Sequence, residues 1–138
     1  MRNFGWVCIM VFTVMMCSAC SGKAPKCTDF NTASTTMAQT LEQFAIVLEQ
    51  TPDTTQAVAK IRAMLDERNA ALEPCMQIVS RTIQAMDPQQ ILTIHEKYIA
   101  DPRVRRFLDA QDKFQESATS DQIELLDELV GQLYITAE

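Results

Sequence analysis

The sequence has little glycine, little proline and only one histidine. Three of its 138 residues are glycine and five are proline, so the residues that favour tight turns are scarce. No stretch alternates apolar and polar residues in the way of a half-buried strand, and apolar residues recur instead at helical spacing. These features predict an all-α fold.

Catalytic motifs are missing as well. There is no GxSxG, no HExxH and no glycine-rich phosphate loop, and without CxxC or CxxCH neither thiol redox catalysis nor covalent haem attachment is indicated. The single histidine, His95, has only apolar or aromatic neighbours at helical spacing, which favours packing at the edge of an apolar face: Ile91, Leu92, Tyr98 and Ile99. We expect a protein that is not an enzyme and that carries neither cofactor nor metal.

The N-terminal segment is apolar but short. Arg2 is the only charge before Lys23, and residues 4–16 form an apolar run of thirteen. A membrane-spanning helix needs about 20 such residues, whereas this length, a positive start and small residues at the end are typical of a secretory signal peptide. Residues 1–19 are therefore expected to be absent from the mature fold.

Ser18, Ala19 and Cys20 close that segment with small residues directly before a cysteine. This end resembles the lipobox of bacterial lipoprotein precursors, with Cys17 where an aliphatic residue is usual, and the resemblance covers only the first 20 or so residues. It implies that signal peptidase II cleaves before Cys20 and that Cys20 receives a diacylglyceryl group and then an acyl chain such as palmitate. The alternative is an ordinary secretory signal that leaves Cys20 a free thiol.

The residues after Cys20 bear on localisation and domain organisation. Ser21 is not the aspartate associated with retention in the inner membrane, so the resemblance implies the outer membrane, with the protein facing the periplasm. Two or three acyl chains anchor a protein durably. The polar run SGKAPK predicts a tether that reaches at most about 20 Å. We expect a signal peptide at 1–19, a lipidated tether at 20–27 and a periplasmic helical bundle at 28–138.

The net charge of the mature chain argues against nucleic acid as a partner. Removal of residues 1–19 leaves 11 Lys and Arg against 18 Asp and Glu, a net charge of −7. Nucleic-acid binding needs clustered basic residues, so we expect no such partner. Arg103, Arg105 and Arg106 form a local basic spot. It either pairs with the acidic C-terminal helix of the same chain or serves as a docking patch for an acidic partner or a lipid head group.

Capping residues and prolines divide the mature chain into helices. We expect the first at 29–50, with an apolar stripe at Met37, Leu41, Phe44 and Leu48. A second should begin near 51–53 and kink or break at Pro74, because the residue before a proline disfavours helical dihedrals. Two more should follow Asp87 and Asp101, each cap being followed by a proline at the first helical position. The last should follow Thr119 and carry Ile123, Leu126, Leu129, Val130 and Leu133. The chain is thus predicted to form one bundle of about five helices.

Five cysteines need separate explanations. Cys8 and Cys17 leave with the signal, and Cys20 is the lipidation site. Cys27 and Cys75 remain in an oxidising compartment, where disulfides persist. Their midpoint is residue 51, at the predicted turn, so an antiparallel hairpin would bring them level and within bonding distance. We predict a Cys27–Cys75 disulfide, and two cysteines with one histidine do not match zinc-ligand spacing.

The sequence favours an outer-membrane-anchored, non-enzymatic helical module that binds another cell-envelope protein as an adaptor, pilot or structural component. Small helical lipoproteins that pilot secretin subunits are organised similarly, although no motif identifies this chain as one of them. The alternative is a carrier of a small apolar ligand or haem within the bundle, which would need a cavity beside His95 or Pro74.

Overall fold

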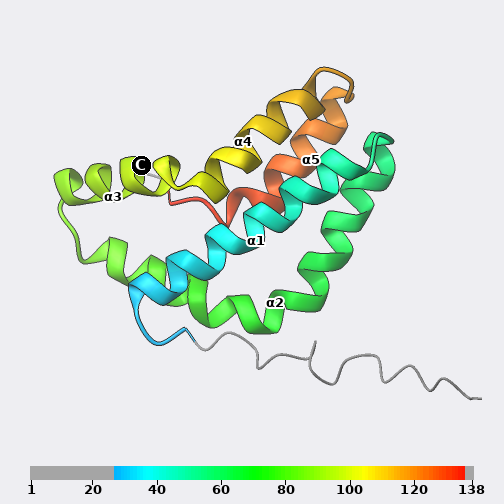
Figure 1. The fold of residues 1–138 in the computed structure, drawn as a ribbon. Helices are drawn as coiled ribbons and strands as arrows, with labels where there is room; N and C mark the ends of the chain where they lie inside the picture. The colour runs from blue at the N-terminus through cyan, green and yellow to red at the C-terminus, as the bar shows by residue number, and fades with distance from the viewer. Residues whose placement is uncertain (1–26, 136–138) are drawn as a thin grey trace, which may run out of the picture.

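The computed structural model describes residues 27–135 of the chain, which fold into five helices (Figure 1). They are α1 (Phe30–Gln50), α2 (Thr54–Gln84), α3 (Pro88–Ala100), α4 (Pro102–Gln115) and α5 (Ser120–Gly131). The predicted all-α bundle with one disulfide is confirmed. The predictions on the signal peptide, on Cys20 and on residues 21–26 lie outside the described residues. Within residues 27–135 no helix is both long and apolar enough to cross a bilayer.

The helices begin where capping residues stand in the sequence. Each capping side chain accepts a hydrogen bond from a backbone N–H two or three residues further on: Asp29, Asp53, Asp87, Asp101 and Thr119. At two starts a glutamine at the third helical position accepts in return from the N–H of the cap, which completes a capping box. Such caps satisfy N–H groups that have no partner within the helix, and so the local sequence fixes the helix boundaries.

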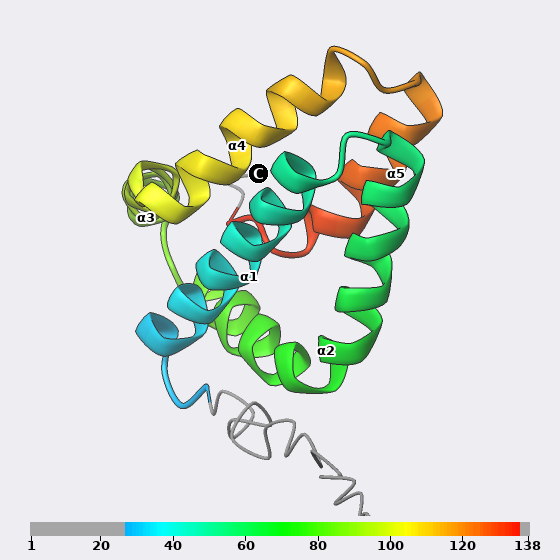
Figure 2. The same cartoon turned by 45° about the vertical axis from the view of Figure 1, so that its right-hand side comes forward.

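The two longest helices form an antiparallel hairpin, and α1 lies at the centre of the molecule between α2 and α4 (Figure 2). On α1 the predicted stripe is buried at Met37, Leu41 and Phe44, and α1 packs against both α2 and α4. Buried residues of α2 are Ala57, Val58, Ile61, Leu72, Cys75 and Val79. The core of the protein therefore lies around α1.

Pro74 lies inside α2, which continues as one helix from Thr54 to Gln84. Both views show α2 bending within its length. Proline has no N–H for the carbonyl four residues earlier, and its ring presses on that carbonyl, so a helix bends at this point. Of the two outcomes expected at Pro74, the break does not occur, because α2 runs through this residue as one helix.

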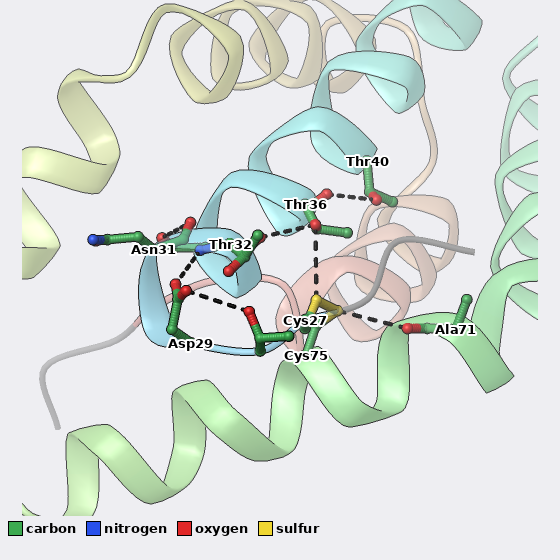
Figure 3. The surroundings of a disulfide bond; sticks show 10 residues. Cys27, Asp29, Asn31, Thr32, Thr36, Thr40, Ala71 and Cys75 are labelled. Carbon is green, nitrogen blue, oxygen red and sulfur yellow. Dashed lines mark hydrogen bonds between the residues drawn. A yellow bond between two sulfur atoms is a disulfide. The ribbon is translucent and has the colours of Figure 1, made fainter. Parts of the chain in front are cut away.

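The predicted disulfide joins Cys27 to Cys75, with their Cα atoms 5.1 Å apart (Figure 3). Cys75 is fully buried and Cys27 is half-buried. The Cys27 sulfur lies 3.8 Å from the Thr36 hydroxyl, and the Cys75 sulfur 3.6 Å from the Ala71 carbonyl oxygen. The bridge thus fastens the start of the described chain to the second half of α2.

The C-terminal helix is shorter than predicted. It ends at Gly131, while Leu133, expected on its apolar face, lies beyond it together with Ile135. Both side chains are only 1% exposed. Tight turns produce this ending, since the N–H of Leu133 bonds the Val130 carbonyl at 2.8 Å. Residues 132–135, the C-terminal segment, then run back from α5 towards α3 and α4 (Figure 1).

Candidate functional site

Helix α3 is the least buried helix of the described chain. Its only buried residue is Tyr98, and Leu92, at 42% exposed, is the one exposed large apolar side chain within residues 27–135. Ile91, Ile94 and Ile99 are half-buried. Because α3 packs mainly on α4, part of its apolar surface is not covered by another helix.

Two side chains of α3 hold the C-terminal segment. The Tyr98 hydroxyl donates to the Leu133 carbonyl at 2.8 Å, and His95 Nδ1 bonds the Ile135 carbonyl. A carbonyl oxygen only accepts, so Nδ1 carries the proton. Burial raises the pKa of the Tyr98 phenol, which therefore stays protonated as a donor. His95 is half-buried, and its role here is to bind backbone.

A cleft of about 650 Å³ opens between the first turns of α1, helix α3 and the C-terminal segment. Half of its lining residues are apolar: Phe30, Ile94, Tyr98, Ala100 and Ile135. The other half are polar or charged: Asn31, Ser34, Thr35, Lys97 and Asp101. This α3 cleft lies beside His95, one of the two places where the carrier alternative needs a cavity.

The two charged residues of the α3 cleft differ in their partners. Asp101 receives two side-chain bonds from Arg103, at 2.7 and 3.0 Å, and these hold the pKa of Asp101 below its ordinary value. Lys97 is exposed, and within residues 27–135 no carboxylate lies within ion-pair distance of it. Within the described residues, the cleft therefore offers one cation without a carboxylate partner, beside an acid that is already paired with Arg103.

Within residues 27–135, the α3 cleft brings together neither a nucleophile with a base nor a set of metal ligands. Its serine, Ser34, donates to the Asn31 carbonyl at 3.1 Å and has no histidine against it, so nothing activates it as a nucleophile. No group of three potential metal ligands occurs in the described part of the chain. Small-molecule sites are generally lined mainly by apolar side chains, whereas half of the residues that line this cleft are polar or charged.

No family model, curated protein or solved structure matches the chain. Evidence on function therefore comes from the geometry of this molecule. Sequence reasoning did not single out the cleft, because it joins three segments far apart in the chain: 30–35, 94–101 and 135. The one available signal was His95, whose apolar neighbours pointed to this side of α3.

The three arginines of the predicted basic spot have different surroundings. Arg103 is bound to Asp101, and Arg106 forms ion pairs with Glu49 at 2.8 Å and with Glu42 at 3.6 Å. The Arg106 guanidinium also holds the pKa of Glu49 below its ordinary value. Arg105 is exposed. The intramolecular pairing therefore involves the α4 cap and α1, and not the acidic C-terminal helix that the sequence suggested.

Proposed function

We propose that the protein is an outer-membrane lipoprotein, anchored through lipid on Cys20, whose bundle binds another envelope protein without catalysing a reaction. The Cys27–Cys75 disulfide is the observation that carries this proposal. Cys27 follows Cys20 by seven residues, a span of about 25 Å when fully extended. Because the disulfide fastens Cys27 to α2, a lipid on Cys20 would keep the bundle itself within about 25 Å of the membrane surface.

The end of the bundle remote from Cys27 carries exposed carboxylates, which favour a partner with a basic surface. The turn between α4 and α5 lies at the opposite end of the molecule from the start of α1 in both views (Figures 1 and 2). Exposed carboxylates flank this turn: Asp112, Glu116, Asp121, Glu124 and Glu128. Complementary charge mainly speeds and directs association. Because Arg103 and Arg106 are already paired, we place the docking surface on this acidic end and not on the arginines.

Crosslinking in cells tests the proposal. We expect the membrane-extracted protein to carry the mass of its acyl chains and to recover the same partner repeatedly. Glu116→Lys combined with Glu124→Lys should weaken recovery about tenfold, whereas Arg105→Glu, an exposed charge reversal of the opposite sign, should not. Failure to recover any reproducible partner would contradict the binding function. A chain without acyl mass would contradict the anchor.

The α3 cleft favours a second candidate, a carrier of a small ligand with an apolar part. Its volume lies within the roughly 300–1,000 Å³ typical of small-molecule sites. Haem receives less support, since the lining residues include no histidine, methionine or cysteine to serve as the usual axial ligand. Ligand carriage does not exclude the adaptor function, because the cleft and the acidic end lie on different elements.

A further inference from the structure

We infer that the α3 cleft binds a fatty acid, one acyl chain that ends in a single carboxylate. This inference rests on the carrier function proposed above and specifies its ligand. It concerns the space between residues 30–35 of α1, residues 94–101 in and just after α3, and Ile135. It does not depend on the identity of a protein partner.

The acyl chain would lie on the apolar part of the lining. Tyr98 and Ile135 are buried and form the floor, while Phe30 and Ile94 are half-buried and stand at the sides. A ligand that covers this half-exposed apolar surface removes it from water, which lowers the free energy of the complex. The cleft volume of about 650 Å³ lies within the range of small-molecule sites and leaves room for one acyl chain.

The carboxylate would bind at the polar rim. Lys97 supplies a positive charge with no carboxylate partner within residues 27–135. In that same part of the chain the Asn31 amide and the Thr35 hydroxyl are exposed and have no side-chain hydrogen bond to a described residue. Charge-assisted hydrogen bonds to a carboxylate are stronger than neutral ones, so this rim favours an anionic head group over a hydroxyl.

Asp101 restricts the charge of the head group that the cleft can bind. Its carboxylate also lines the cleft, and although Arg103 compensates its charge, it would repel a head group that carries two negative charges more than one that carries a single charge. A carboxylate therefore fits better than a phosphate monoester. The position of the cleft agrees with a lipid ligand, because Phe30 follows Cys27 by three residues and so lies on the side of the tether.

Photolabelling of the full chain in phosphatidylcholine nanodiscs tests the inference. Diazirine-bearing palmitic acid is the probe, adducts are located by peptide mass spectrometry, and competition with unlabelled palmitate gives an apparent Kd. We expect adducts within residues 30–35 and 94–101. Lys97→Gln should raise the apparent Kd about fivefold, the scale of one partly exposed charge contact. Thr35→Trp, a bulky change at an exposed position on the rim, should abolish labelling while the melting temperature stays unchanged.

Controls separate this inference from the carrier function. Lys113→Gln changes an exposed lysine outside the cleft, and Leu92→Asn an exposed apolar residue of α3 outside it; neither should alter the apparent Kd. Hexadecanol should compete about fivefold more weakly than palmitate. Equal competition by hexadecanol, or no effect of Lys97→Gln, would overturn the fatty-acid inference and leave a carrier. Absence of palmitic acid adducts in the cleft would overturn the fatty-acid inference outright.

Discussion

The α1–α2 hairpin and helix α3 are held in place by different interactions. The hairpin interdigitates fully buried side chains such as Leu41, Phe44 and Ile61, and a disulfide crosslinks it. Helix α3 has one buried residue and depends on two side-chain bonds to carbonyls of the C-terminal segment. Regions with few buried contacts open at lower free energy than the core around them. The cleft thus lies where the most firmly packed part of the protein meets the least.

Removal of the disulfide should have the largest effect. Replacing Cys27 and Cys75 together by alanine opens a crosslink that spans 48 residues, and the chain-entropy model then gives a loss of about 4 kcal/mol in unfolding free energy. Urea denaturation followed by circular dichroism measures it. Cys20→Ser, which leaves the bridge intact, should not change this stability. A loss below about 1 kcal/mol for the double variant would show that packing alone holds the hairpin.

The next largest effect is expected from a leucine-to-alanine substitution, compared between the α1–α2 hairpin and helix α3. Leu41→Ala empties a fully buried site on α1 and should lower the unfolding free energy by about 3 kcal/mol. Leu92→Ala, at the 42% exposed position on α3, should change it by less than about 0.5 kcal/mol. Chemical denaturation of the two variants side by side checks the difference. Similar losses would mean that α3 is packed as firmly as the hairpin.

A smaller effect is expected from the hydroxyl of Tyr98. Tyr98→Phe leaves the buried Leu133 carbonyl without its donor and should lower the unfolding free energy by about 1 kcal/mol. Hydrogen exchange should accelerate more in α3 than in α1. Tyr134→Phe provides the control, because its hydroxyl donates to Gln111 at the half-buried surface and its loss should cost less. Uniform acceleration across all helices would contradict a local role.

The smallest effect should have the opposite sign. A methyl group added at Gly131 meets no atom within 4 Å, and the glycine ends α5 directly before the C-terminal segment. Gly131→Ala should raise the unfolding free energy by about 0.5–1 kcal/mol, because alanine favours the helix. Thermal denaturation should show the gain, with slower amide exchange in residues 132–135. A destabilised variant would indicate that the turn after α5 requires glycine.

Helix starts and the disulfide were predictable from sequence because both depend on local or evenly spaced signals. A cap acts on N–H groups within its own first turn, and Asp87 with Gln90 specifies a capping box within four residues. The pairing of Cys27 with Cys75 followed from the position of a single turn midway between the two cysteines in the sequence. Apolar spacing likewise indicated which face of α1 is buried.

The α3 cleft could not be predicted, because its parts meet through backbone acceptors. His95 and Tyr98 bond carbonyls 40 and 35 residues away, and every residue has a carbonyl, so no side-chain pattern marks the partner. The apolar spacing around Leu133 also continued the helical pattern past Gly131, although the chain leaves the helix there. Arg106 pairs with Glu42 and Glu49 of α1, although α5 carries more acidic residues. The packing of the helices, and not the number of acidic residues on each, determines which carboxylates lie near Arg106.

The long crosslinked loop also determines how the protein responds to force. Tension applied to the chain before Cys27 passes through the disulfide into α2. Helix α1 is therefore not unfolded from its N-terminal end. The 48-residue loop stays hidden from the pull, which shortens the contour released on stretching by about 170 Å. If Cys20 carries the proposed lipid, tension between the membrane and the bundle would therefore leave this loop closed.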